Sequence, residues 1–269
     1  MPKVIKEINK YMSLEFAFIR FTLIELMQYK INFFIRSIYE LMETATTLLY
    51  FCIVLGKVGN IAGWSIGQLV FITIYAFLID SLCTLLFIGG MSSIPPQIEE
   101  GKFDLMLLKP INTQYYIFFH RPNPAQIFNT IIGIVGLIFT TVYYHISQDI
   151  YSVFLFVVST LSSMVIMYCV LSIIIHLSFW FIRIGNLWSI VFTFHMAATR
   201  PAAIYNKGMK IFMTLIIPSI VVLNVPVEII SNNKDNLLCY ISLPVALVFL
   251  ILNHVVSQAG LKRYTSAGS

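Results

Sequence analysis

The chain has 269 residues, of which 58% are hydrophobic and only 11% charged, with a formal net charge of +5 at pH 7. A soluble domain carries about 25% charged residues, so this composition excludes a water-soluble globular protein. Several apolar runs reach the roughly 20 residues with which a helix crosses about 30 Å of hydrocarbon. We therefore predict a single all-α, polytopic transmembrane domain over residues 1–269.

The first predicted element is an amphipathic helix over residues 11–30. Its apolar residues recur at spacings of four, three, four and three, which places them on one helical face: Met12, Phe16, Ile19, Leu23 and Leu26. Such a helix lies in the membrane interface, because crossing would bury Glu15, Arg20 and Glu25 at roughly 2.5–3.5 kcal/mol for each central charge. The alternative is a cytosolic helix that packs on a partner.

We predict six membrane-spanning helices. The first four lie at residues 31–55, 64–91, 125–144 and from Tyr151 to about Ile182. The rest of the chain offers three apolar runs, at residues 186–198, 211–230 and 237–257. Because prolines break the middle run, and such a break at membrane depth survives only where protein or water covers the freed backbone groups, we predict a kinked or re-entrant element within residues 200–230.

The placement of lysine and arginine predicts that both termini face the cytoplasm, including a tail over residues 258–269. With the N-terminus inside, most basic residues fall on that side: Lys3, Lys6, Lys10, Arg20, Lys30, Lys102, Lys109, Arg121, Arg183, Lys262 and Arg263. Residues Arg200, Lys207 and Lys210 stay open. A re-entrant hairpin after the fifth span would put them outside, and a span over 208–230 would put them inside. Lysines at the inner leaflet account for the basic balance without nucleic acid.

A polar segment over residues 92–124 separates the second and third spans on the cytoplasmic side. Prolines and a glycine delimit a short helix within it: Pro95, Pro96, Gly101 and Pro110. Phe103, Met106 and Leu107 share one face of that helix, and water would not stabilise this apolar face unaided. We predict a docking element, and the alternative is an ordinary structured loop.

The sequence IEEGKFDLMLLKPI in this segment resembles the pattern I-x-x-G-x-[FL]-D-x-x-L-x-[KR]-P-[IL] of a branch of the type 2 ABC exporter permeases. The matching residues are Ile98, Gly101, Phe103, Asp104, Leu107, Lys109 and Pro110. RPAAIYNKGMKIFMTLIIPSIVVLNVP is similar to the proline-marked segment before the last span of that branch, and GLKRYTSAGS is similar to its tail. One departure is Arg200, which stands where an aromatic residue usually precedes the proline.

The resemblance implies the membrane subunit of an ATP-driven exporter in a bacterial cytoplasmic membrane. Residues 11–30 would be its elbow helix. The chain would pair with a second permease, identical or diverged, and with two ATPase subunits that bind ATP and Mg. Outward transport would carry a hydrophobic or amphipathic cargo such as a lipid, peptide or drug. The ATPase-coupling element would consist of Ile98, Glu99, Glu100, Gly101, Phe103, Asp104, Leu107, Lys109 and Pro110.

The chain contains no G-x-x-x-x-G-K-[ST] phosphate loop, so we expect no ATPase activity and no cofactor in this chain itself. The four cysteines stand apart, and no Cys/His spacing predicts a metal site. The main rival is a secondary transporter that is not coupled to ATP. That class often shows interrupted helices in both halves of the chain, whereas here the interruption appears only in the second half.

Four charged residues fall inside predicted spans. Arg36, Glu40 and Glu43 share a face early in the first span, and Asp80 lies well inside the second. Ionisable groups at membrane depth are costly and usually face protein or water, often in pairs. One hypothesis is that Arg36 pairs with Glu40 while the other two take neighbouring donors. The other is that these residues line a polar substrate path. The sequence does not predict the cargo.

Overall fold

The computed structural model describes residues 2–28, 30–58, 60–146, 149–181, 185–231 and 240–263. Within these ranges every regular element is a helix, and an isolated bridge joins Ile61 to Trp64 in the turn before the third helix. The last six residues of the predicted tail, and residues 237–239 of the predicted last span, lie outside the described residues.

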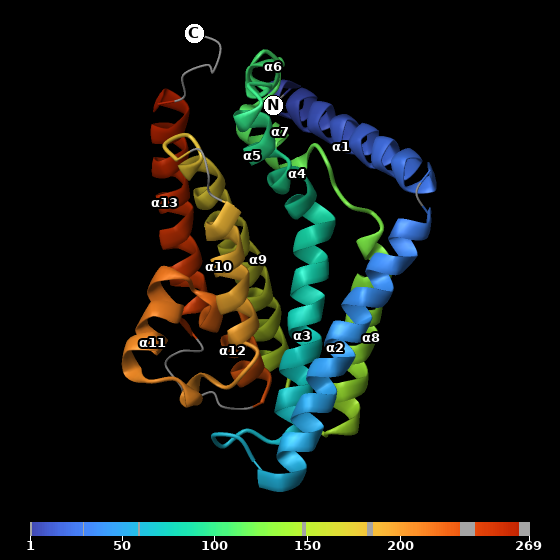
Figure 1. The fold of residues 1–269 in the computed structure, drawn as a ribbon, viewed down its shortest axis with the longest axis vertical. Helices are drawn as coiled ribbons and strands as arrows, with labels where there is room; N and C mark the ends of the chain where they lie inside the picture. The colour runs from blue at the N-terminus through green and yellow to red at the C-terminus, as the bar shows by residue number, and fades with distance from the viewer. Residues whose placement is uncertain are drawn as a thin grey trace.

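Long helices form a bundle, and short helices connect or cap them (Figure 1). The long ones are α2 (Lys30–Val58), α3 (Ile66–Cys83), α8 (Gln126–Tyr143), α9 (Ile150–Leu177), α10 (Gly185–Ala197), α12 (Ser219–Ile230) and α13 (Ser242–Arg263). At one end stand α4 (Gly89–Ser92), α5 (Ile94–Glu99), α6 (Phe103–Leu107) and α7 (Thr113–Phe119). We call this the α6 end.

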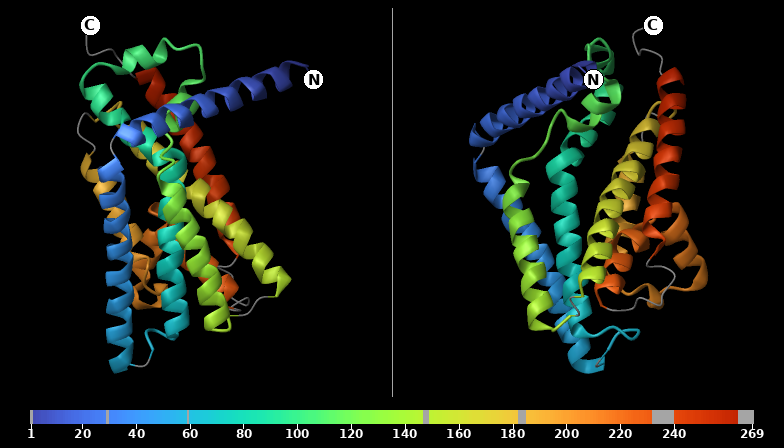
Figure 2. Two further views of the ribbon diagram at one scale, coloured as in Figure 1. Left: turned by 90° about the vertical axis from the view of Figure 1, so that its right-hand side faces the viewer. Right: turned by 180° about the vertical axis from the view of Figure 1, so that it is seen from behind.

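Helix α1 (Pro2–Gln28) lies across the α6 end, at a steep angle to the long axis of the bundle (Figure 2). The N-terminus and the end of α13 are also at the α6 end. The turn between α2 and α3 lies at the opposite end, as does the connection from α8 to α9. Helices α2, α3, α8, α9 and α13 therefore run between these two ends, while α10 and α12 are shorter.

Four described helices are long and apolar enough to cross a membrane: Ile66–Ile98, Gln126–Tyr143, Ile150–Leu177 and Ser242–Gly260. They correspond to four of the predicted spans. Helix α2 is 29 residues long, but its first half carries Arg36, Glu40 and Glu43, and it falls outside this group. The apolar part of α10, Leu187–Ala197, is shorter than these four helices. The count of six spans therefore stays a prediction.

The segment after α10 changes direction sharply. It comprises the 3-10 turn η2 (Ala202–Ile204), α11 (Lys207–Ile211) and the π-helical turn η3 (Phe212–Ile216), followed by α12. The helices Lys207–Ile216 and Ser219–Ile230 are bent by 98° at a break that contains Pro218, which has no amide hydrogen to continue the first helix. This bent pair counts as a fifth span only if both parts belong to one crossing.

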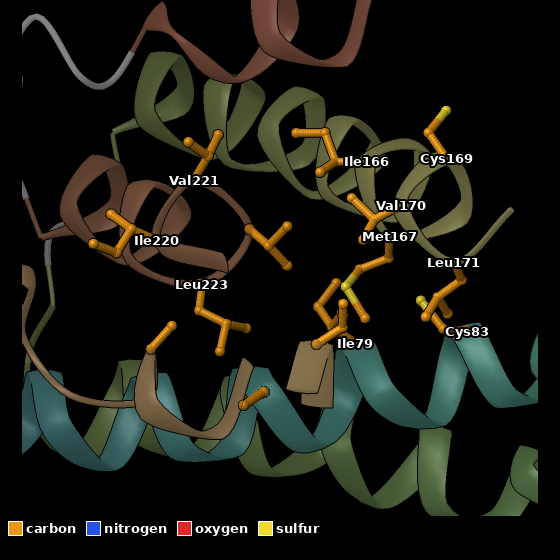
Figure 3. Close-up of a cluster of buried hydrophobic side chains, with 14 of the residues drawn as sticks. Ile79, Cys83, Ile166, Met167, Cys169, Val170, Leu171, Ile220, Val221 and Leu223 are labelled. Carbon is orange, nitrogen blue, oxygen red and sulfur yellow. The ribbon is translucent and has the colours of Figure 1, made fainter. Parts of the chain in front are cut away.

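The core lies where α3, α9 and α12 meet (Figure 3). Ile79 and Cys83 of α3 face Ile166, Met167 and other buried side chains of the two neighbouring helices. Helix α8 packs closely on the other side of α3 because Gly133 has no side chain. A Cβ atom there would lie 3.1 Å from Leu78 Cβ. The core thus fixes α3 between α8 and α9, and α3 carries the polar residues described next.

Candidate functional site

Helix α3 continues almost without interruption into the α6 end. A π-helical turn, η1 (Thr84–Ile88), joins it to α4 and α5, so that the apolar stretch Ile66–Ile98 is 33 residues long. A helix of this length measures about 50 Å, whereas the hydrocarbon core of a bilayer is about 30 Å thick. The stretch is therefore longer than one upright crossing of the hydrocarbon needs.

Residues 94–110, which comprise α5, α6 and their turns, form a compact unit that we call the knob. Pro95 and Pro96 occupy the first turn of α5, where missing amide hydrogens cost nothing. Gly101 has a φ of 68°, and this left-handed conformation lets the chain reverse into α6. The Lys102 amide donates to the Gln97 carbonyl across the turn over 2.8 Å.

The buried face of the knob packs on the same chain. Phe103 is 0% exposed and Met106 is buried, and the Phe103 ring centre lies 5.3 Å from that of Phe179 in the turn after α9. This differs from the sequence-based expectation that Phe103, Met106 and Leu107 together face a partner. Only Leu107 of the three is exposed. The free apolar surface instead consists of Leu105 (65% exposed), Leu107 and Leu108 (80% exposed).

The other predicted coupling residues border this surface. Ile98 packs partly against the core, Asp104 is half-buried, and the Glu99 side chain lies outside the described residues. Glu100 forms an exposed ion pair with Lys102 over 2.6 Å. At the end of the knob, Lys109 Nζ lies 3.9 Å from the centre of the Tyr116 ring. The exposed Pro110 accepts a 3.0 Å hydrogen bond from Lys10 of α1 through its carbonyl.

Helix α1 is attached to the knob and α7 by its polar side. Tyr115 Oη donates to Glu15 Oε1 over 2.6 Å, and Arg121 pairs with Glu25 over 3.0 Å. The pKa of Tyr115 is raised, mainly by burial and secondly by the hydrogen bond to Glu15. The phenol therefore keeps its proton and donates it in this hydrogen bond. Four residues of the predicted apolar stripe are exposed: Met12, Phe16, Ile19 and Leu23. The apolar stripe of α1 is therefore largely exposed, and the rest of the described chain buries little of it.

The second group of candidate residues surrounds Glu40 of α2. Arg36 Nε donates to Glu40 Oε1 over 3.0 Å, and Gln126 Nε2 donates to the same oxygen over 3.0 Å. Asn129 Nδ2 donates to Glu40 Oε2 over 2.6 Å. These two amides belong to α8 and are buried. Three donors therefore stabilise the Glu40 carboxylate and join α2 to α8.

Glu40, Glu43 and Asp80 line one cavity of about 300 Å³ between α2, α3 and α10. The remaining lining residues are Thr44, Thr47, Thr73, Ala76, Phe77, Ser81, Thr84, Phe192, Met196 and Thr199. We call this the polar cavity. Arg36 instead lines a separate cavity of about 360 Å³ near Glu25 and Arg121, under α1. The structure thus brings three of the four predicted intramembrane charges together.

His195 of α10 stands behind Asp80. Its Nε2 lies 3.0 Å from Asp80 Oδ1, but the two groups are not aligned as a hydrogen bond. The imidazole is 1% exposed, and neither of its ring nitrogens has a hydrogen-bond partner among the described residues. Within the described ranges, no group of three or more His, Cys, Asp or Glu side chains could hold a metal ion.

Comparison with known families decides the class of the protein. The model of a family described as ABC-2 family transporter protein matches residues 41–268. The chain belongs to this family. Comparisons with curated proteins and with solved structures gave no match. As an ABC type 2 permease, the chain is a multi-pass integral membrane subunit and is not itself the ATPase.

Several polar residues of this ABC-2 permease escaped the sequence reasoning. Glu228 is a buried carboxylate in α12, and its position inside the apolar run PSIVVLNVPVEII was the signal that could have found it. Gln126 and Asn129 stand three residues apart at the start of the third predicted span. That spacing on one helical face was a signal as well. His195 carried no such signal, because only the tertiary placement of α10 brings it to Asp80.

Proposed function

We propose that the chain is the membrane-spanning permease subunit of an ATP-driven exporter, and that the knob docks on a separate ATPase subunit. The observation that carries this proposal is the exposed apolar surface of Leu105, Leu107 and Leu108, which lies just beyond the end of the helix Ile66–Ile98 that continues α3. Exposed leucines beside a charged rim are typical of a protein interaction site. ATP and Mg would bind only to the partner subunits.

The buried side of the knob supports a mechanical role. Phe103 contacts Phe179 beside α9, the α4–α5 segment extends α3, and Lys10 of α1 binds the Pro110 carbonyl. A force applied to the knob therefore reaches the bundle and α1 through packed contacts, because close-packed side chains transmit displacement. Closure of the ATPase dimer would push the knob and tilt α3 and α9, so that cargo moves outward.

The membrane arrangement follows from the same proposal. The α6 end would face the cytoplasm of a bacterial cell, with both termini on that side. Six spans would comprise α2, α3, α8, α9, α10 and α13, with the bent pair α11–α12 re-entering from the outer side. Helix α1 would be an elbow helix whose exposed apolar stripe lies among the lipid headgroups, as amphipathic interfacial helices do. A second permease chain would complete the transport path.

Copurification tests the proposal. The tagged chain, expressed in its own host and extracted in a mild nonionic detergent, should bring down an ATPase, and the Leu105→Glu/Leu108→Glu variant should not. Lys262→Glu, an exposed charge change on α13 at the same end, is the matched control and should retain the ATPase. Transport by the purified chain without any nucleotide-binding partner would overturn the proposal in favour of a secondary transporter.

Orientation provides an independent check. Lys102 has a side-chain exposure of 64% and lies in the turn of the knob, so an amine-reactive reagent can reach it. A membrane-impermeant reagent should label Lys102 in inverted vesicles and not in intact cells. Labelling from outside intact cells would place the knob away from ATP and would contradict the proposed coupling.

A further inference from the structure

We propose that the polar cavity binds the ammonium group of a cationic amphipathic cargo. This inference rests on the proposed exporter function and deepens it by naming a substrate class. The cavity lies beside the middle of the span Ile66–Ile98, between α2 and α10. Its depth means that the groups in its wall contribute to affinity more strongly than they would at a water-exposed surface.

The charge of the lining is negative. Glu40 already has a cationic partner in Arg36 and two amide donors. In the part of the chain that the structure describes, no lysine or arginine pairs with Glu43 or Asp80. A carboxylate at the centre of a membrane helix costs roughly 2.5–3.5 kcal/mol, and a cation nearby lowers this cost. A cationic ligand would supply the missing charge, whereas an anionic ligand would add repulsion.

The hydroxyl groups of the lining add acceptors rather than donors. Thr44 donates its hydroxyl hydrogen to the Glu40 carbonyl over 3.0 Å, and Thr47 donates to the Glu43 carbonyl over 3.1 Å. Three more hydroxyls in the wall also donate to carbonyls of their own helices: Thr73, Ser81 and Thr199. Because a hydroxyl has only one hydrogen, these side chains offer the cavity only lone pairs. A ligand with several N–H donors complements such a wall.

A buried histidine without a hydrogen-bond partner, His195, lies next to Asp80 of the cavity wall. His195 is 1% exposed, its ring nitrogens are unpaired, and Asp80 Oδ1, 3.0 Å away, also lacks a hydrogen-bond partner. Unsatisfied buried polar atoms are rare in folded proteins and each costs about 1–3 kcal/mol. His195 itself does not line the cavity, so a ligand meets this group only through the Asp80 carboxylate, whose side chain is 36% exposed and would pair with an ammonium group.

The size of the cavity suits a headgroup with a short apolar stem. A volume of about 300 Å³ is at the lower end of the roughly 300–1,000 Å³ of small-molecule sites. Phe77, Phe192 and Met196 form its apolar wall. Aromatic faces attract cations as well as apolar chains. The rest of an amphipathic cargo would extend into the lipid.

Three eight-carbon probes test the proposal: octylamine, which is cationic at pH 7, octanol and octanoate. Their binding to the full chain in nanodiscs is measured by titration calorimetry, with partitioning into empty nanodiscs subtracted. We expect saturable binding of one octylammonium per chain and only partitioning for the other two. Octanoate or octanol binding as tightly as octylammonium would overturn the proposal.

Isosteric variants locate the site. Glu43→Gln/Asp80→Asn should weaken octylammonium binding by roughly tenfold or more, because each lost charge-assisted hydrogen bond is worth about 1.5–3 kcal/mol. Glu7→Gln, which removes an exposed carboxylate from α1, is the matched control and should bind as wild type. Thermal unfolding identifies a misfolded double variant. The single variant Glu43→Gln, at an exposed position, then provides the test. Unchanged affinity in folded variants would refute the site.

The outcomes separate this inference from the exporter function. If an ATPase copurifies and drives transport, but octylammonium does not bind, the cavity proposal alone fails. If octylammonium binds as described and no ATPase ever associates, the exporter function fails while the cation site remains. If both hold, octylammonium should stimulate ATP hydrolysis by the wild-type complex and not by the double variant.

Discussion

Tyr115 of α7 donates a 2.6 Å hydrogen bond to Glu15 of α1, joining two residues that are 100 positions apart in the chain. The Tyr11 and Tyr115 rings meet edge to face beside it, with centres 4.5 Å apart. This contact connects helix α1 to the segment that follows the knob.

The first prediction concerns this contact. Tyr115→Phe should lower the free energy of unfolding in detergent by about 1.5–3 kcal/mol, because it removes a hydrogen bond to a charged, partly buried acceptor. Tyr39→Phe, at an exposed tyrosine of α2, makes the same chemical change and should have little effect. Equal effects of the two substitutions would show that the contact does not stabilise α1.

The second prediction separates the two faces of the knob. Phe103→Ala should destabilise the protein by about 3–5 kcal/mol, since it empties a buried aromatic site. Leu108→Ala should leave the unfolding temperature unchanged and weaken ATPase binding. Unfolding and copurification, measured on the same preparations, give both values. The expectation is wrong if Leu108→Ala proves the more destabilising change.

The third prediction concerns the close approach of α4 and α7. At Gly90, a Cβ atom would lie 2.4 Å from the Phe118 carbonyl oxygen, which is backbone and cannot turn aside. Gly90→Ala should therefore cost about 1–3 kcal/mol through overpacking. At Gly208 the nearest atom to such a Cβ is 3.7 Å away, so Gly208→Ala should be neutral or stabilising. Thermal unfolding of both variants tests this prediction, and it is wrong if Gly90→Ala is no less stable than Gly208→Ala.

The fourth prediction concerns Asn224 of α12. Its side chain accepts from the Ala202 amide over 2.8 Å and donates to the Ala198 carbonyl over 2.7 Å. Asn224→Leu should cost about 2–6 kcal/mol, because both buried backbone groups lose their partners and each is worth about 1–3 kcal/mol. Ser231→Ala, near the end of α12, is a milder control. If Asn224→Leu unfolds like wild type, the Asn224 bridge is not important for the bent segment.

The fifth prediction concerns pH. Burial lowers the pKa of His120, at the end of α7, below its usual 6.5. The unfolded chain therefore binds the proton more readily, so the stability from His120 is present above pH 6.5 and is lost as pH falls through the lower folded pKa. His120→Gln should flatten the fall in unfolding temperature between pH 7 and pH 5. One proton accounts for at most about 1.4 kcal/mol per pH unit. An unchanged pH profile would contradict this assignment.

Span positions were predictable because the bilayer imposes them on the sequence. The predicted third span at 125–144 is helix Gln126–Tyr143, and three further predicted spans coincide with apolar helices. Helix α2 was harder to classify, since two of the three donors that satisfy Glu40 come from α8 and only Arg36 comes from its own segment. Composition alone therefore could not tell a spanning helix with paired charges from an interfacial one.

Helical periodicity predicted which residues share a face, but not what covers that face. The stripe of Phe103, Met106 and Leu107 is real, yet Phe179 covers its first member. The exposed Leu105 and Leu108 were not singled out, because they lie off the apolar stripe. Likewise, Asp80 was recognised from its position in an apolar run. Its neighbour His195, 115 positions away, depends on tertiary packing.

The π-helical turn η1 sets the rotational phase of everything that follows it on the same helix. A single extra residue in a helix with 3.6 residues per turn rotates the downstream side chains by about 100°. Gly90, which admits the Phe118 carbonyl, therefore faces α7 with the rotational phase that the underwound turn Thr84–Ile88 gives to the helix after it. Deleting one residue of Leu85–Ile88 would point the knob in a different direction around the helix axis, whereas the α3 residues and Thr84 that line the polar cavity precede the deletion.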